Sequence, residues 1–272
     1  MTAIADYGRQ PGWSFSGVPV LVYHGLSDET HTAIPPKERK YWVGRLQFRE
    51  HLDCIFQLGY QVWSLRELKN RTYRGSSFRS AVVITFDDGR SSDYQVAFPL
   101  LLQASMKAEF FINTANVGAP GYLSWREIEE MQDAGMSIQS HGHEHLDLSR
   151  LPPSELERQL RLSKYILEDR LGRPVHFLAA PHGRLNRRVI QEAIRVGYQA
   201  VCSARSLPAC PDARKLNRVV LLRDTALSDF QQLLDRKPFP YLTRLARAPL
   251  YWPERVVRWF ETIDIRQGAA KR

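Results

Sequence analysis

Short apolar runs separated by amphipathic stretches recur along most of this chain. Eight of these runs predict β-strands, at residues 18–24, 60–64, 81–87, 107–113, 136–141, 174–180, 197–203 and 216–222. Several are apolar at consecutive positions and do not alternate with polar residues, which is typical of strands buried on both faces. A helix-like stretch follows many of the runs. The pattern therefore predicts an α/β protein in which strands and helices alternate around a parallel sheet.

The stretches between the strands carry helix signals. Ser64, Ser124 and Ser154 each stand three positions before a glutamate, which predicts a capping box at the start of a helix. Residues 46–59 and 185–197 have apolar residues at three- and four-residue spacing and end at glycine, as helices often do. This number of strand–helix units favours a barrel. In barrels of this kind, catalytic side chains gather at the carboxyl ends of the strands.

Composition and charge narrow the function classes. The chain has 272 residues, 43% of them hydrophobic, so it can bury a sizeable core. Its net charge of +9 is uneven, because residues 236–272 hold nine Arg or Lys against three Asp or Glu. No basic stripe interleaved with aromatic residues runs through the first 235 residues. This distribution argues against a nucleic-acid partner.

The N-terminal sequence and the cysteines bear on location. MTAIADYGRQPGW lacks the basic and apolar regions of a secretory signal, and no run approaches the ~18 apolar residues of a membrane span. Cys54, Cys202 and Cys210 form neither a disulfide framework nor a CxxC metal site. We therefore expect a cytoplasmic protein with reduced thiols.

The basic, aromatic C-terminal segment suggests a peripheral membrane contact. Pro253 suits a helix start, and Val256, Val257, Phe260 and Ile263 then fall on one helical face. With basic residues around it, such a helix suits an anionic membrane surface. Packing of the same apolar face on the barrel is the alternative.

Three polar motifs follow predicted strands. TFDDG occupies 85–89, SHGHEH occupies 140–145 and AAPHG occupies 179–183. Taken singly, they are compatible with a turn, a solvated histidine-rich loop and a proline–glycine turn. Taken together at strand ends, they offer two imidazoles and a carboxylate, a recognised catalytic metal set that leaves a position open for water. The four-residue spacing of His141 and His145 places both on one face of a helical turn.

At these motifs the chain resembles the NodB-type polysaccharide deacetylases, carbohydrate esterase family four. TFDDG resembles the first family motif, SHGHEH the second, an H-x-x-x-H, and FLAAPHG a variant of the third. VPVLVYHGL and LSWREIEEMQDAGMSIQSH are similar to further family segments. The resemblance covers residues 18–235 and implies a distorted (β/α) barrel in a single domain. An N-terminal segment, 1–17, and a C-terminal extension, 236–272, would flank it.

The resemblance implies a metal-dependent hydrolase that removes N-acetyl or O-acetyl groups from an amino sugar, oligosaccharide or polysaccharide. The implied ligands of its one divalent metal are Asp88, His141 and His145. Zn is the expected metal, and Co, Ni, Mn or Fe would also suit these ligands. Asp87 would be the general base. The turn at Pro181 and His182 would bind substrate, with the backbone N–H of His182 helping to hold the oxyanion.

The sequence departs from the family pattern at two positions. Ala179 stands where many members have an arginine that orients the catalytic aspartate. Arg218 stands where a late L-x-H motif has the general-acid histidine, and a permanently charged arginine cannot supply that acid. The candidate acids by residue type are His24, His143 and His182, and we expect His24. Arg218 is expected to bind substrate, or else to replace the missing arginine beside Asp87.

Two other functions are compatible with the sequence. A glycan-binding relative without catalysis would keep the groove and lack the acid, which the exchanges at Ala179 and Arg218 would explain. A deacylase could instead act on a lipid-linked sugar or on a non-sugar amide.

Overall fold

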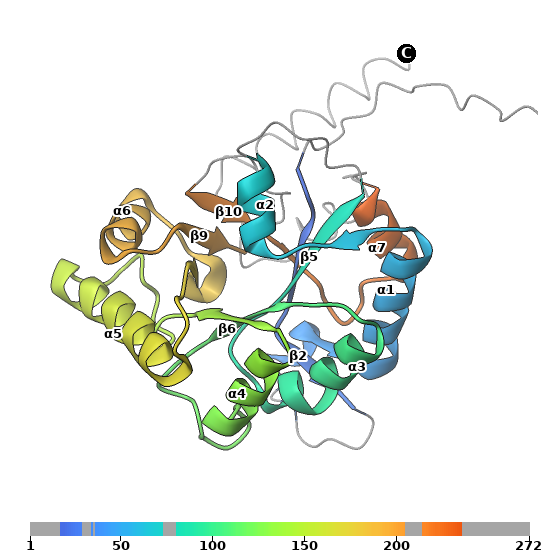
Figure 1. Cartoon of the computed structure of the whole chain (residues 1–272), viewed down its shortest axis with the longest axis horizontal. Coiled ribbons are helices and arrows are strands. Elements are labelled where there is room, and N and C mark those ends of the chain that lie inside the picture. The colour runs from blue at the N-terminus through green and yellow to red at the C-terminus, as the bar shows by residue number, and fades with distance from the viewer. Residues whose placement is uncertain (1–16, 29–33, 35, 73–79, 205–213, 236–272) are drawn as a thin grey trace, which may run out of the picture.

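The fold is built around one parallel sheet that nearly closes into a barrel (Figure 1). The computed structural model describes residues 17–28, 34, 36–72, 80–204 and 214–235. The sheet contains β1 (Val20–Tyr23), β4 (Gln61–Val62), β5 (Ala81–Phe86), β6 (Glu109–Ile112), β7 (Ser137–Ser140), β8 (Phe177–Ala179), β9 (Ala200–Ser203), β10 (Lys215–Asn217) and β11 (Val219–Val220). Its strand order is β10-β9-β8-β7-β6-β5-β1-β11, with β4 paired to β5. The predicted barrel of alternating strands and helices is therefore confirmed, as a single domain.

The barrel is closed by one stretch of chain that reaches both edges of the sheet. β10 pairs with β9, whereas β11 pairs with β1, both in parallel. Only Arg218 separates β10 from β11 in the sequence. The run predicted at 216–222 is therefore two short strands with Arg218 at the junction, because one segment changes its pairing partner there.

The helices surround the sheet on its outer side, apart from the second, which covers one end of the barrel (Figure 1). They are α1 (Arg45–Gln57), α2 (Leu65–Thr72), α3 (Phe98–Gln103), α4 (Trp125–Asp133), α5 (Pro153–Leu171), α6 (Arg187–Val196) and α7 (Leu227–Leu234). Short elements lie between them: β2 (Gly25–Ser27), β3 (Trp42–Gly44), a π-helical turn η2 (Asp93–Ala97), and 3-10 turns η1 (Arg39–Tyr41) and η3 (Pro181–Gly183). The sequence pattern did not indicate α3 and α7. Both are short, and FPLLLQ in α3 is apolar nearly throughout, so it shows no helical period.

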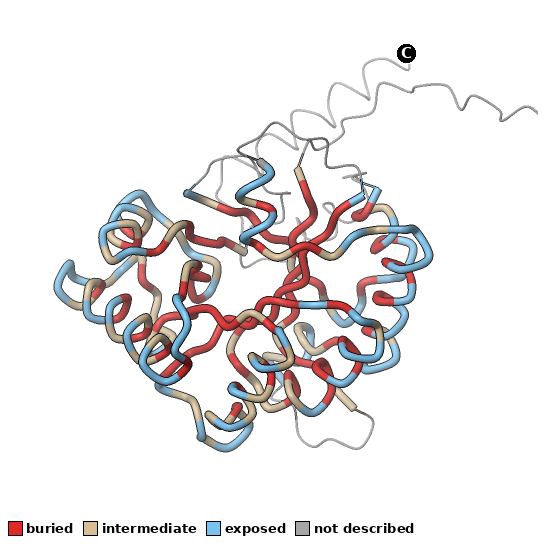
Figure 2. Tube along the Cα trace, in the orientation of Figure 1, coloured by how far each residue is buried: buried red, intermediate tan, exposed pale blue. Residues whose placement is uncertain are grey.

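Two apolar cores lie on the two sides of the sheet. Val20, Val83 and Phe111 belong to a core inside the barrel, whereas Val82 and Ile84 belong to the core under the helices. Figure 2 shows the central strands buried along their length. Both faces of β5 are therefore covered, which explains its continuous apolar run.

The helix starts agree with two of the three predicted capping boxes. The hydroxyls of Ser64 and Ser124 each accept a hydrogen bond from the backbone N–H of the glutamate three positions on. The carboxylate of that glutamate accepts a hydrogen bond from the backbone N–H of the serine. The box at Ser154 is wrong. α5 begins two residues earlier than this box implies, at Pro153, with Pro152 as its N-cap and no side-chain cap. Proline suits the first helical position, because its fixed φ matches the helix and it has no N–H that would need a partner there.

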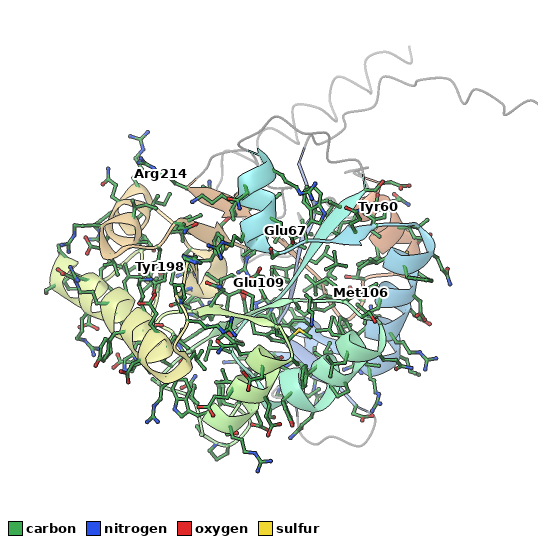
Figure 3. The ribbon with its side chains drawn as sticks, viewed as in Figure 1. Tyr60, Glu67, Met106, Glu109, Tyr198 and Arg214 are labelled. Carbon is green, nitrogen blue, oxygen red and sulfur yellow. The ribbon has the colours of Figure 1, made fainter. Side chains whose placement is uncertain are left out.

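α2 closes the amino end of the barrel and thereby leaves the carboxyl end for the site. Trp63, Leu65 and Leu68 belong to the core inside the barrel. The backbone N–H of Leu65 donates to the buried carboxylate of Glu109, at the start of β6, over 2.8 Å. Glu109 is labelled near the middle of Figure 3. The three polar motifs lie at the other end of the strands.

The remaining sequence expectations concern membrane spans, the cysteines and the two ends of the chain. None of the helices within the described ranges is long and apolar enough to cross a membrane. Cys54 and Cys202 are buried free thiols. Outside the described residues lie Cys210, the membrane-contact helix expected at 253–265, and the flanking segments 1–16 and 236–272.

A buried histidine in α1 makes the stability of the fold dependent on pH. The Nδ1 atom of His51 lies 3.0 Å from the hydroxyl of Tyr23, and its ring stacks on Phe230 at a centroid distance of 4.0 Å. Burial lowers the pKa of His51 from 6.5 to about 4. Between pH 6.5 and pH 4, His51 therefore binds a proton in the unfolded chain but stays neutral in the folded protein. Stability present above pH 6.5 is lost as the pH falls towards 4.

We expect this one histidine to remove about 2 kcal/mol of unfolding free energy between pH 7 and pH 5, at about 1.36 kcal/mol for each pH unit below 6.5. Urea unfolding of the wild type and of His51→Phe at both pH values measures the effect. Phenylalanine keeps the stacking on Phe230 and does not titrate, so the variant should lose about 2 kcal/mol less than the wild type. Equal losses in both proteins would contradict the assignment.

Candidate active site

The two adjacent aspartates after β5 face different partners because the backbone turns between them. Asp87 continues the strand and is 2% exposed. Asp88 has a φ of 79° and Gly89 a φ of 69°, both in the left-handed region. Non-glycine residues adopt this region rarely, and such strain concentrates at functional sites. The turn gives each carboxylate a separate environment.

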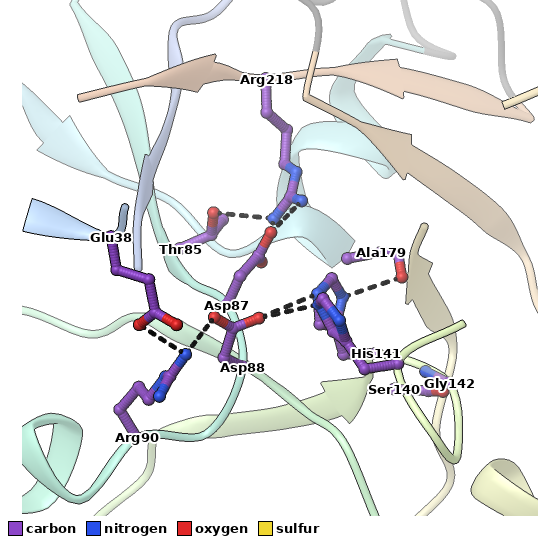
Figure 4. A network of polar contacts seen from close by, with 11 residues as sticks. Glu38, Thr85, Asp87, Asp88, Arg90, Ser140, His141, Gly142, Ala179 and Arg218 are labelled. Atoms are coloured by element: carbon purple, nitrogen blue, oxygen red, sulfur yellow. Dashed lines mark hydrogen bonds and ion pairs between the residues drawn. The ribbon is translucent and has the colours of Figure 1, made fainter. Parts of the chain in front are cut away.

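Arg218 holds Asp87 in a buried bidentate ion pair. The Nη1 and Nη2 atoms of Arg218 donate to the two carboxylate oxygens of Asp87, each over 2.7 Å (Figure 4). Nη1 also donates to Thr85, and the guanidinium lies 4.8 Å from the ring centre of Phe111. Burial opposes ionisation of Asp87, but the charge of Arg218 outweighs it and lowers the pKa of Asp87. Asp87 is therefore a carboxylate, ready to accept a proton.

This geometry decides between the two expectations for Arg218. Its side chain is fully buried, and both terminal nitrogens are occupied by Asp87. The guanidinium has no exposed surface with which to contact a substrate. The geometry therefore does not support direct substrate binding by Arg218, and it supports the expectation that Arg218 replaces the missing arginine beside Asp87. Arg218 orients Asp87 from the barrel-closing segment, while Ala179, at the usual arginine position, lies in the core inside the barrel.

Asp88, His141 and His145 bring three metal-ligand atoms together. The Oδ1 atom of Asp88 lies 3.1 Å from Nε2 of His145 and 3.4 Å from Nε2 of His141 (Figure 4). One ligand atom from each residue lies within 4.8 Å of the others. The helical-turn argument for this pair is wrong, since residues 141–145 form a loop and His145 has a φ of 55°. The loop nonetheless brings the two rings to a centroid distance of 5.0 Å.

The chemistry of this triad fits a divalent cation. Asp88 Oδ1 is buried and accepts no hydrogen bond. Nδ1 of His141 lies 3.0 Å from the carbonyl oxygen of Ala179, so it carries the proton and leaves Nε2 with a free lone pair. Burial favours the neutral forms, yet the two histidines hold the pKa of Asp88 well below its usual value, and the carboxylates of Asp87 and Asp88 raise the pKa of His141. A buried carboxylate facing two imidazoles is stabilised by positive charge at this point.

The three candidate acids lie in different surroundings. His24 follows β1 and is close enough to the carboxylates of Asp87 and Asp88 for their charges to act on its pKa, which burial lowers. Its Nδ1 atom is buried and has no protein partner. His143 is not part of the triad, and its Nδ1 lies 2.8 Å from the hydroxyl of Thr114. His182 is exposed, and its ring meets that of His145 edge-on at 4.7 Å.

The turn after β8 brings a third strand end to the site. Pro181 is buried and opens the 3-10 turn η3, in which His182 has a φ of 59°. Gly183 follows with a φ of 64°, and a Cβ there would lie only 2.6 Å from the Cβ of Ala204. Glycine is therefore required for this turn to pack against the strand end.

Several polar residues of the site were missed by sequence reasoning. Arg90 lies 3.5 Å from the second oxygen of Asp88 and 3.0 Å from Glu38 (Figure 4). Asp93 and Asn113 are buried, and their side-chain oxygen and nitrogen atoms have no protein partner. The position of Arg90 directly after TFDDG was a usable signal. Glu38 and Asn113 lie in unrelated segments, so only folding shows that they approach these strand ends.

Buried polar atoms without partners concentrate near the triad. Of the nine such atoms in the described part of the chain, six belong to His24, Asp88, Asp93 and Asn113, which follow β1, β5 and β6. Buried polar groups in folded proteins are nearly always satisfied. This concentration indicates a region built to bind polar ligands such as an ion, water or substrate.

Comparisons with known proteins agree with this geometry. Residues 75–201 match the sequence model of the family described as polysaccharide deacetylase, a range that includes all three motifs and excludes His24 and Arg218. The YxkH protein of Bacillus subtilis, whose name provisionally assigns it to the polysaccharide deacetylases, is 30% identical over 183 residues. That alignment covers 67% of this chain and 62% of YxkH, so the chain spans less than two thirds of that relative.

Two further relatives extend the comparison. A poly-beta-1,6-N-acetyl-D-glucosamine N-deacetylase of Staphylococcus aureus is 25% identical over 214 residues, covering 73% of this chain and 72% of its own length. The structure of the Streptococcus pyogenes deacetylase PplD in complex with acetate superposes with a TM-score of 0.72 and 26% identity. It covers 81% of this chain and 98% of that one. The barrel therefore has a counterpart in a solved deacetylase structure.

Proposed function

Because this chain belongs to the polysaccharide deacetylase family through the match of its residues 75–201, we propose that it is a metal-dependent amide hydrolase acting on N-acetylated amino sugars. The observation that carries the proposal is the metal-ligand triad beside a separately held carboxylate. Asp88, His141 and His145 converge on one point, while Asp87 is fixed by Arg218. This arrangement separates cation binding from proton transfer.

The proposed substrate class is an oligosaccharide or polysaccharide that contains N-acetylglucosamine. The Staphylococcus aureus relative is named for a β-1,6-linked polymer of this sugar, and its alignment covers most of this chain. Acetate release from oligomers of different linkage and length would show which glycan of this class is preferred.

The proposed reaction adds water to the acetamide and releases acetate and a free amine. A divalent cation held by Asp88, His141 and His145 would supply a Lewis acid for the water and for the acetyl oxygen. Asp87 would take the proton of the attacking water, because Arg218 keeps it ionised and in a fixed orientation. The backbone N–H of His182 would stabilise charge on the acetyl oxygen.

His24 is the proposed donor of the proton that the leaving amine needs. Its support is its position near both aspartates and the absence of a protein partner at Nδ1. His143 contacts the hydroxyl of Thr114, and His182 is exposed, with its ring edge-on to that of His145. Burial holds His24 neutral at rest, so it would gain a proton before donating one, and the neighbouring carboxylates favour that protonated form.

The alternative of a glycan-binding relative without catalysis loses part of its support in this geometry. It rested on Ala179 in place of the usual arginine and on Arg218 in place of the late histidine. Arg218 now accounts for the first exchange, because it contacts Asp87 with both terminal nitrogens. For the second exchange, His24 is the proposed replacement for the missing general-acid histidine.

We expect acetate release from N-acetylglucosamine oligomers that depends on a bound metal. β-1,4- and β-1,6-linked oligomers are incubated with the full chain before and after treatment with a chelator, and acetate is measured enzymatically. Chelation should abolish turnover, and Zn²⁺ or Co²⁺ added back should restore it. Glycan binding without any chelator-sensitive acetate release would contradict the proposed function and favour the binding relative.

A further inference from the structure

Two histidines of the site adopt a strained backbone in neighbouring loops. His145 lies in the loop after β7 with a φ of 55°, and His182 lies in the turn after β8 with a φ of 59°. Their rings meet at a centroid distance of 4.7 Å. Left-handed conformations of non-glycine residues persist only where the surrounding structure enforces them. The two loops must therefore be held in place near these residues.

A set of bonds joins the two loops two residues beyond each histidine. Arg184 Nη1 donates to Asp147 Oδ2 over 2.6 Å, and Asn186 and Arg188 donate to the backbone carbonyl of Ser149 over 3.1 and 3.2 Å. We call these five residues, Asp147, Ser149, Arg184, Asn186 and Arg188, the loop clasp. Two of them come from the loop of His145, and three follow His182.

The loop clasp is itself anchored at both ends. Asp147 also accepts from the N–H and hydroxyl of Ser149, over 3.1 and 2.6 Å, and Leu148 between them is fully buried. Asn186 is the N-cap of α6, where its side chain accepts from Val189 over 3.0 Å. An isolated surface ion pair contributes little. Here both partners are tied to fixed elements, so their bond transmits the position of one loop to the other.

We propose that the loop clasp positions His145 and His182 relative to each other, and so sets the distance between the metal ligand and the oxyanion-binding N–H. The proposal rests on the proposed function for the roles of these two histidines. The clasp residues act through the histidines and have no contact with the reacting atoms. Small displacements of catalytic groups have large kinetic effects, about 10²-fold for 1 Å.

The test uses Asp147→Asn, Arg184→Gln and the double variant of the full chain. Each single change should lower kcat for acetate release about tenfold with little change in KM, because binding surfaces stay intact while the site is misaligned. The zinc dissociation constant, measured by competition with a fluorescent chelator, should rise about tenfold, as it does when outer partners of metal ligands are lost. The double variant should be no worse than Asp147→Asn, since that single change already removes the carboxylate that pairs with Arg184 and, over 3.4 Å, with Arg150.

Arg195→Gln is the matched control. Arg195 forms a 2.8 Å ion pair with Glu157 that joins α6 to α5, and both side chains are exposed to a degree similar to that of Arg184. This variant should keep wild-type kcat and zinc affinity. An equal loss in the control, fully additive losses in the double variant, or wild-type values in both single variants would overturn the proposal.

A readout without turnover separates this inference from the proposed function. In zinc-loaded protein, the imidazole ¹H–¹⁵N signals of His145 and His182 should both shift in Arg184→Gln, whereas those of His51 should not. If the wild type releases no acetate from any glycan, the proposed function fails. The histidine signals and the zinc affinity would still test whether the loop clasp positions the two histidines. Unchanged signals for both histidines would count against it.

Discussion

Replacement of Asp87 by asparagine lowers the turnover number by about 10²–10⁴-fold while the protein still binds its metal. Asparagine has nearly the same shape but cannot accept a proton from the attacking water. The metal-ligand atoms come from Asp88, His141 and His145, so the change leaves all three in place. Acetate release and zinc content, measured on the same purified sample, give the two numbers that the prediction needs.

Asp88→Asn is the contrasting variant, one position along the chain. It removes the carboxylate that faces both histidines, so zinc content should fall together with turnover. His24→Gln should resemble Asp87→Asn, with turnover lost and zinc retained, if His24 is the acid. Equal loss of zinc from Asp87→Asn and Asp88→Asn would show that the two carboxylates do not divide these tasks.

Replacement of Arg218 by methionine lowers the unfolding free energy by about 3–5 kcal/mol, the usual cost of removing one partner of a buried ion pair. Asp87 would be left buried with a charge and no counterion, since Arg218 supplies two of its hydrogen bonds. The position also lies between β10 and β11, at the closure of the barrel. Urea unfolding at pH 7 measures the loss.

A second substitution shows whether the loss comes from the unpaired charge. Asp87→Asn combined with Arg218→Met removes both charges, and replacing a whole buried pair is often nearly neutral. The double variant should therefore recover most of the stability that Arg218→Met loses. Arg218→Lys keeps the charge but cannot make two parallel bonds, so it should lie between the wild type and the methionine variant. If the double variant is as unstable as Arg218→Met, packing at the barrel closure and not the charge is the cause.

Arg218 contacts Asp87 from the junction of β10 and β11, whereas the family pattern places an arginine for this contact at the end of β8. The family pattern has an arginine where Ala179 stands, and Ala179 and Arg218 both lie at strand ends of the same barrel. A guanidinium can reach Asp87 from either strand because parallel strands bring their carboxyl ends to one place. The absence of the motif arginine is therefore no sign of a missing interaction here.

The sequence by itself determined the fold class and indicated the three residues that the structure brings together as a possible metal site. Continuous apolar runs such as that of β5 require a sheet covered on both faces, and TFDDG and SHGHEH each begin in the last residues of a strand. Local signals also placed the starts of α2 and α4, because a capping serine and its glutamate interact within four residues. Where the local signal was weak, as in α3 and α7, or had a competing solution, as at Ser154, it failed.

Only the tertiary structure decided which distant residues meet. The pairing of Arg218 with Asp87 joins positions 131 residues apart, and Arg90, which lies beside Asp88, pairs with Glu38 across a separation of 52 residues. The loop clasp likewise links two turns separated by a long helix, α5. Such contacts depend on the register of the strands and on how the barrel closes. No short stretch of sequence encodes these features, because each results from packing the whole chain at once.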